Sequence, residues 1–109
     1  MQNEIVPLPA DHLAPAITSS HADLFGMWVA SLEARAKAGM LAEKTAEAYT
    51  SNGKAWVAFL DAAGINRPGP ADVVAWVGEL HEAGLKPATV NAKLAAVKAL
   101  YGWAETAEL

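Results

Sequence analysis

The chain has 109 residues, of which 53% are hydrophobic, and its formal net charge is -4. This length fits a single domain, and so large a hydrophobic fraction excludes an intrinsically disordered chain. The sequence has no cysteine, which excludes disulfides, thiolate metal sites and cysteine nucleophiles, and its acidic balance argues against unspecific binding to polyanions.

Residues 1–19 predict a flexible N-terminal tail. Pro7, Pro9 and Pro15 interrupt this segment, and its apolar residues follow no regular period. It has no basic region before an apolar run, so a signal peptide is not expected. No stretch of the chain approaches the roughly 20 apolar residues of a membrane span. We therefore expect a cytoplasmic protein that does not contact a membrane.

A folded domain is expected over residues 20–109, and its first helix starts at a capping-box pattern, "SHAD" (20–23). This helix is expected to reach about Ala38, and Gly39 ends it. Its apolar side contains Leu24, Phe25, Trp28, Val29 and Leu32.

A second helix is expected over residues 43–63. Helical spacing predicts a buried face with Tyr49, Trp56, Phe59, Leu60 and Ala63. The opposite side holds Lys44, Ser51, Lys54 and Ala58. Gly53 lies within this helix, where glycine is less favourable than alanine by about 1 kcal/mol. The glycines and prolines of "GINRPGP" (64–70) predict a turn after the helix.

Two more helices follow, the third over about 71–83 and the fourth from about Pro87. The third has an apolar side of Val73, Trp76, Val77 and Leu80, and Gly84 ends it. Proline suits the first turn of the fourth helix because its missing N–H would be unpaired there anyway. The core stripe of the fourth helix is Val90, Leu94, Val97 and Tyr101. No segment alternates like a strand, so we predict an all-α, compact four- to five-helix bundle.

The segment from 84 to 104 contains Lys86, Lys93 and Lys98 and no acidic residue, whereas the rest of the chain holds every Asp and Glu. One interpretation is a solvated helix face. The other is a phosphate-contacting helix, because cations, hydroxyls and free N-terminal N–H groups are what phosphates need. Small residues expected to face away from the core would let a backbone approach closely; they are Ala92, Ala96 and Ala99.

Other chemistry has little support in the sequence. The histidines, His12, His21 and His81, are not spaced as metal ligands, and there is no Gly-rich phosphate loop or nucleophile elbow. We expect no metal, no cofactor and no small-molecule substrate. The tryptophans suggest packing rather than a ligand cage, because Trp28, Trp56 and Trp76 lie on or beside core stripes. Trp103 lies off the stripe of its helix.

Two stretches carry a family resemblance. "LAEKTAEAYTSNGKAWVAFL" (41–60) resembles the pattern Leu-Ser-x-x-Thr-x-x-x-Tyr followed by an aromatic-rich helix end. "GLKPATVNAKLAAVKALYGWA" (84–104) resembles Gly-Leu-Ser-x-x-Thr-x-Asn-Arg-x-Leu-Ser-Ala-Leu-Arg-x-Phe-Tyr. With "ADVVAWVGELHEAGL" (71–85) between them, their order and spacing resemble the N-terminal core-binding, SAM-like domain of tyrosine recombinases and phage integrases. The resemblance covers about residues 22–107.

The resemblance implies a DNA-binding domain that forms half of a C-shaped clamp around double-stranded DNA at a recombination site. It also implies partner protomers in a tetrameric synaptic complex for DNA integration or recombination. In such recombinases a separate C-terminal domain holds the catalytic arginines, histidines and tyrosine. That machinery has no counterpart in the chain, so we expect that the chain is not an enzyme and that the catalytic domain is absent from it.

Carried over residue by residue, the resemblance implies DNA contacts from two helices. The candidate DNA-binding residues are Lys44, Thr45, Lys54, Lys86, Thr89, Asn91, Lys93 and Lys98. The sequence also departs from the family pattern. Ala42 and Lys86 stand where a capping serine is common, Ala92 where an arginine is common and Ala95 where a serine is common. These replacements leave few side chains that could contact DNA.

Two alternatives remain. The acidic balance, the alanine-rich faces and Trp103 are also compatible with a helical protein-interaction module that does not bind DNA directly. A free-standing helix-turn-helix regulator is disfavoured, because no short helix pair contains a basic recognition helix. A salt titration separates DNA binding from protein interaction, because phosphate contacts release counterions.

Overall fold

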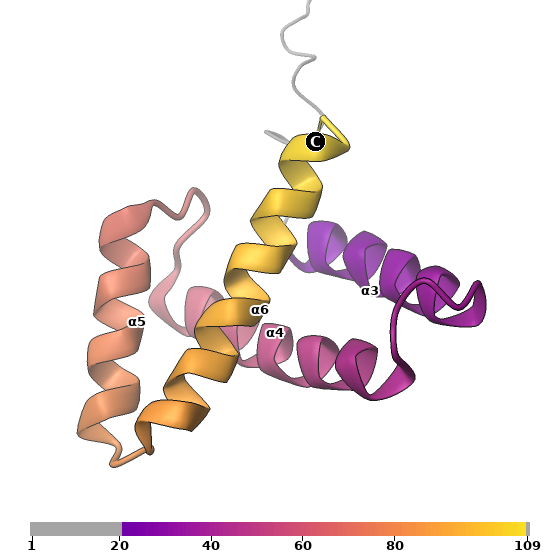
Figure 1. Ribbon diagram of the computed structural model, residues 1–109. Coiled ribbons are helices and arrows are strands. Elements are labelled where there is room, and N and C mark those ends of the chain that lie inside the picture. Colours follow the sequence, from indigo (N-terminus) through magenta and orange to yellow (C-terminus); the bar gives the residue numbers. More distant parts are fainter. Residues whose placement is uncertain (1–20, 109) are drawn as a thin grey trace, which may run out of the picture.

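The computed structural model describes residues 21–108 and folds them into four helices (Figure 1). They are α3 (His21–Lys37), α4 (Glu43–Ala63), α5 (Pro70–Glu82) and α6 (Pro87–Thr106). No residue between 21 and 108 is in a strand, which confirms the all-α prediction. The expected tail over 1–19 and the expected cap at Ser20 lie outside the described residues.

The helix boundaries follow local signals in the sequence. α4 spans the residues predicted for it, and α5 begins at Pro70 rather than at Ala71. The predicted stops Gly39 and Gly84 have φ angles of 76° and 84°. This left-handed conformation favours glycine, which has no Cβ to clash with the backbone. Pro87 occupies the first position of α6, as predicted.

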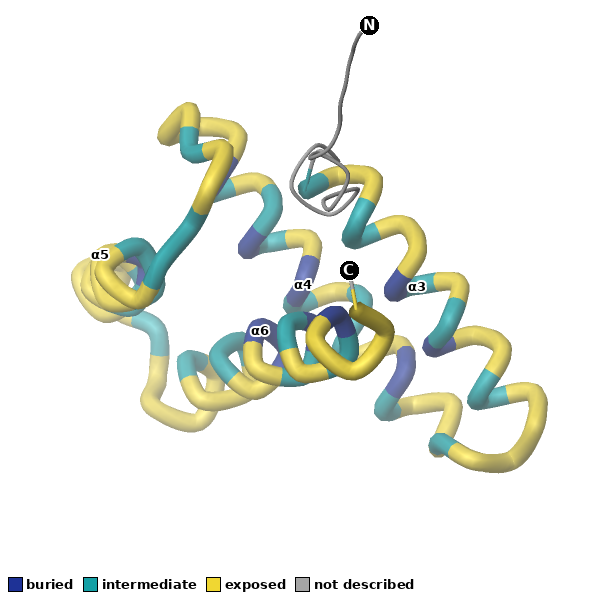
Figure 2. Tube along the Cα trace, turned by 90° about the horizontal axis from the view of Figure 1, so that it is seen from above, coloured by how far each residue is buried: buried dark blue, intermediate teal, exposed yellow. Residues whose placement is uncertain are grey.

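The four helices form two pairs, α3 with α4 and α5 with α6, and α6 crosses the first pair (Figure 1). α3 and α4 lie side by side and run in opposite directions (Figure 1, Figure 2). α6 crosses them steeply and contacts all three other helices of the described chain. α5 lies along α6, on the side away from α3 (Figure 1). α6 therefore holds together elements that are far apart in the sequence.

Three tryptophans from three helices form the centre of the core. Trp28 of α3 and Trp56 of α4 are completely buried, and Trp76 of α5 is nearly so. The Trp56 and Trp76 rings meet edge to face, with centroids 5.1 Å apart. The Trp56 Nε1–H donates a hydrogen bond to the Tyr101 hydroxyl over 2.9 Å, which satisfies the polar group of a buried indole. These contacts confirm the packing role predicted for the three tryptophans.

Gly53 has a structural role that the helix pattern did not indicate. A Cβ atom at this position would lie 2.6 Å from Cε1 of Phe25 and 2.9 Å from Cζ3 of Trp28. Both distances are shorter than carbon atoms tolerate, so α3 reaches its present position only because residue 53 lacks a side chain. Gly53 therefore lowers the helix propensity of α4 but allows α3 to pack closely on it.

The alanine faces differ in part from the prediction. Ala92 is exposed as expected, but Ala96 is fully buried and Ala99 packs against the core. The reason is that α6 packs against three helices, so its buried surface is wider than one stripe. Trp103 also packs against the core from outside that stripe. Conversely, Ala63 is exposed, because it lies at the last residue of α4.

Candidate functional site

The N-cap residues of α4 and α6 form no side-chain capping hydrogen bond, and neither does Gly69, the N-cap residue of α5. Ala42 precedes α4 with φ -63° and ψ 139°, and Lys86 precedes α6 with φ -70° and ψ 151°. Both have the extended backbone of an N-cap residue, yet neither forms a side-chain capping hydrogen bond. The first backbone N–H groups of a helix have no partner within the helix. At these two ends, their positive partial charge remains available to an outside anion.

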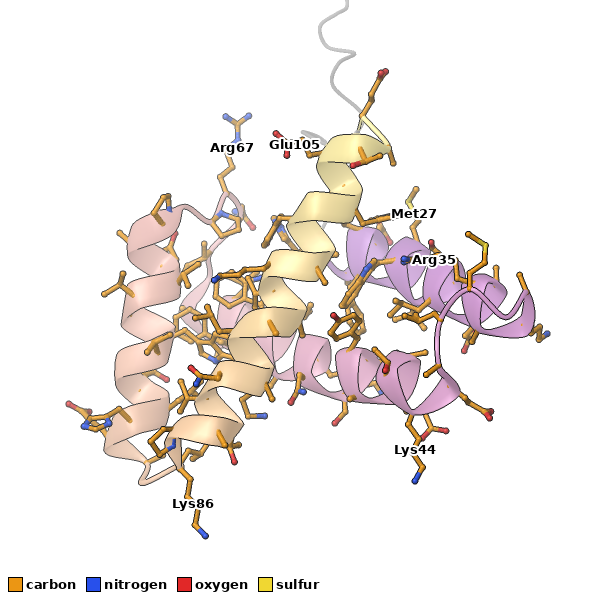
Figure 3. The ribbon with its side chains drawn as sticks, viewed as in Figure 1. Met27, Arg35, Lys44, Arg67, Lys86 and Glu105 are labelled. Carbon is orange, nitrogen blue, oxygen red and sulfur yellow. The ribbon has the colours of Figure 1, made fainter. Side chains whose placement is uncertain are left out.

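A lysine accompanies each of these uncapped ends. Lys44 lies in the first turn of α4, and Lys86 directly precedes α6. Both side chains are exposed, and both point away from the helices toward the same side of the molecule (Figure 3). Thr45 is half-buried beside Lys44, and Thr89 is exposed in the first turn of α6. Lysine and threonine side chains thus accompany both helix ends, and α4 also has one carboxylate, Glu43, in its first turn.

A side-chain hydrogen bond joins α4 and α6 where they cross. The Lys93 ammonium of α6 donates a hydrogen bond to the Asn52 Oδ1 of α4 over 3.4 Å. Both side chains are half-buried. Asn52 is absent from the predicted candidates, although it lies seven residues after Thr45. Seven residues make about two helical turns, so this spacing alone places Asn52 on the same side of α4 as Thr45.

The candidates on α6 divide between two sides of that helix. At about 100° per residue, Lys86 and Thr89 lie on the side of Lys93, at seven and four residues from it. Asn91 and Lys98 lie about 160° and 140° away around the helix, and both are exposed. The structure therefore groups Lys86, Thr89 and Lys93 and does not bring Asn91 and Lys98 to the same side.

Lys54 lies in a different electrostatic setting. It lines an open groove of about 820 Å³ between α3 and α4. The same groove is lined by the carboxylates of Glu33, Glu43 and Glu47 and by Lys37. A nearby carboxylate reduces the attraction that a lysine exerts on a phosphate. Lys54 thus has acidic neighbours, whereas the segment that contains Lys86 and Lys93 has none in its sequence.

The described part of the chain offers little other chemistry. Over residues 21–108, no group of three or more His, Cys, Asp and Glu side chains is placed to hold a metal ion. Within the same residues, no helix is long and apolar enough to cross a membrane. His21 lies edge-on to Tyr101 with ring centroids 6.2 Å apart, and burial lowers the pKa of this histidine. His81 is exposed, and His12 lies outside the described residues.

Comparison with protein-family models shows which family the chain belongs to. The family model described as phage integrase, N-terminal SAM-like domain, matches residues 29–108. The chain belongs to this family. The match includes both stretches that carry the sequence resemblance, and all of α4, α5 and α6. Neither a curated protein nor a solved structure gives a significant match.

The family match covers the candidate side chains of this integrase SAM-like domain. All the candidate DNA-binding residues fall within the matched range, from Lys44 to Lys98. The matched family is a domain of enzymes that recombine DNA, which gives the chain a role in the recombinase family. The side of the domain that gathers Lys44, Lys86, Thr89 and Lys93 is termed the α4–α6 face below.

Proposed function

We propose that this integrase SAM-like domain binds double-stranded DNA at a recombination site through its α4–α6 face. The observation that carries this proposal is the pair of uncapped, lysine-bearing helix N-termini on one side of a domain from this family. Phosphate groups are the part of DNA that such a surface suits, because lysines and free N–H groups are both positive.

The chemistry of the face predicts positioning rather than base recognition. A lysine ammonium meets a phosphate as a compact point charge and carries little information about the base sequence. Thr89 adds a hydroxyl near the N-terminus of α6, where it can donate to a phosphate oxygen. In this proposal the domain holds the DNA in register, and a separate catalytic domain cuts and rejoins the strands. The chain alone forms no covalent bond with DNA, and its partners are DNA and other recombinase protomers.

A salt titration tests the proposal. Binding of the chain to a fluorescein-labelled duplex of mixed sequence is followed by anisotropy from about 20 to about 200 mM salt. If Lys44, Lys86 and Lys93 each neutralise a phosphate, the slope of log K against log salt is about -3. Lys86→Ala and Lys93→Ala should each reduce that slope by about one.

Lys37→Ala is the matched control, because Lys37 is an exposed lysine in the last turn of α3. Its removal changes the net charge by the same amount and should leave the slope nearly unchanged. Equal effects of Lys37→Ala and Lys93→Ala would show that only net charge matters, which would contradict the proposed face.

A protein-interaction function is the second candidate, and exposed methionines favour it. Met27 on α3 is 47% exposed and Met40, after α3, is 74% exposed. Flexible apolar side chains of this kind are common on protein-binding surfaces. If the chain fails to bind DNA even at low salt, and Met27→Ser abolishes binding to a second copy or to another recombinase domain, this candidate is preferred.

A further inference from the structure

The pairing of Asn52 with Lys93 distinguishes this lysine from the other cations of the α4–α6 face. Lys44 and Lys86 are exposed, whereas Lys93 is half-buried and its ammonium is held by the Asn52 side-chain oxygen over 3.4 Å. The contact joins two helices at positions 41 residues apart in the sequence. It therefore depends on the crossing of α4 and α6 and not on the order of residues within either helix.

We propose that Asn52 is a positioning residue, which holds the Lys93 ammonium ready to contact a DNA phosphate. This inference rests on the proposed DNA-binding function and adds a residue that the family pattern did not provide. A free lysine has a long, flexible side chain, and fixing it on binding costs conformational entropy. Asn52 already restricts Lys93 in the unbound protein, so less entropy is lost when the phosphate arrives.

The chemical nature of Asn52 suits this role. Its side-chain amide is neutral, so it orients the ammonium without cancelling the positive charge. An aspartate in the same place would also accept the hydrogen bond, but it would neutralise Lys93 and repel phosphate. An ammonium has three N–H donors, and one bond to Asn52 leaves two for phosphate oxygens.

The test is a double-mutant cycle on the chain, with the labelled duplex described above as the probe. Asn52→Ala should weaken binding by about threefold to tenfold, because Lys93 loses its restraint. The salt slope should stay unchanged, because no charge is removed. Lys93→Ala should reduce the slope by about one. In the Lys93→Ala background, Asn52→Ala should have no further effect, since there is no ammonium left to position.

Two further variants separate orientation from structure. Asn52→Gln keeps a neutral side-chain carbonyl and should recover part of the affinity that Asn52→Ala loses. Asn52→Asp should bind DNA more weakly than Asn52→Ala and with a smaller slope, because it adds a negative charge. Asn66→Ala, an exposed asparagine between α4 and α5, is the control and should bind as the parent does. Thermal unfolding identifies any variant that loses its fold, and Asn52→Leu, which removes the acceptor but keeps a similar volume, then replaces Asn52→Ala in the cycle.

The outcomes separate this inference from the function on which it rests. An Asn52→Ala effect of the same size with and without Lys93 would overturn the positioning role and leave the DNA-binding function in place. No effect of Asn52→Ala on affinity would do the same. If the parent chain does not bind the duplex at low salt, both the proposed function and the positioning role are overturned.

Discussion

The N-terminus of α5 differs from those of α4 and α6 in how it satisfies its backbone. Ahead of α5, the Gly69 N–H donates a hydrogen bond to the Asp72 carboxylate over 2.7 Å. Asp72 also places a negative charge in the first turn of α5, as Glu43 does in α4, and the helix dipole favours both. The N-cap residues of α4 and α6, Ala42 and Lys86, contribute no such side-chain bond. The α5 start therefore has one side-chain bond, from the Gly69 N–H to Asp72, whereas the α4 and α6 starts have no such bond and are called open below.

Under the proposed function, this difference separates a structural helix end from a binding one. An absent cap typically costs about 1 kcal/mol of stability, so the open ends of α4 and α6 are less stable than they could be. The same absence leaves N–H groups free, beside Lys44 and Lys86, for an external anion. At α5, the Asp72 carboxylate already accepts the Gly69 N–H; α4 also has a carboxylate in its first turn, Glu43, whereas the first turn of α6 has none. In the proposed function, the domain presents α4 and α6 to a polyanion and uses α5 for packing.

The contrast between the N-termini of α4 and α5 implies that packing near the middle of α4, and not bonding at its N-terminus, holds α4 in place. Gly53→Ala should lower the free energy of unfolding by about 1–3 kcal/mol, because the added Cβ meets Phe25 and Trp28. Urea unfolding measures the change. Gly78→Ala on α5 is the matched control. No atom lies within 4 Å of its added Cβ, so better helix propensity should stabilise the protein by about 0.5–1 kcal/mol.

If Gly53→Ala were as harmless as Gly78→Ala, the packing of α3 on α4 would not determine where α4 lies. The open N-terminus of α4 would then be needed for stability, and the contrast with α5 would fail.

Reversing the charge at the two open ends should change stability and binding in opposite directions. Lys44→Glu and Lys86→Glu each place a carboxylate near a helix N-terminus, which should stabilise the fold by about 0.3–1 kcal/mol. Together they should weaken DNA binding by more than about tenfold, because two phosphate contacts become repulsive. Urea unfolding and anisotropy titration measure the two effects on the same samples.

Lys37→Glu controls for net charge. Lys37 lies in the last turn of α3, where a carboxylate is unfavourable, so this variant should be slightly less stable and should bind DNA almost as the parent does. Unchanged DNA binding by the Lys44→Glu, Lys86→Glu double variant would show that the open helix ends do not contact DNA.

Removing the cap of α5 should affect stability alone. Asp72→Ala takes away the acceptor for the Gly69 N–H and should cost about 1 kcal/mol. DNA affinity should not fall, because α5 is not part of the α4–α6 face. Ala42→Ser, which adds a cap to α4, should stabilise the protein by up to about 1 kcal/mol and weaken DNA binding slightly. A loss of DNA affinity in Asp72→Ala, with the fold intact, would place α5 in the interface.

Much of the fold could be predicted because its signals are local. The 3.6-residue spacing of apolar side chains predicted α4 over 43–63, and Gly39 and Gly84 marked the ends of α3 and α5. Each of these signals acts within about one turn of the chain, so it is visible in the sequence. The missing caps at Ala42 and Lys86 were visible for the same reason.

The sequence by itself therefore determined the helices, their ends, the large core residues and the basic segment that begins at Lys86. Only the tertiary structure decided that Ala96 is buried, that Gly53 admits the rings of α3 and that Lys54 lines a groove with carboxylates. It also decided that Asn52 holds Lys93. The physical reason is that these features arise where two helices pack together, and that packing depends on the shapes of residues that are distant in the sequence.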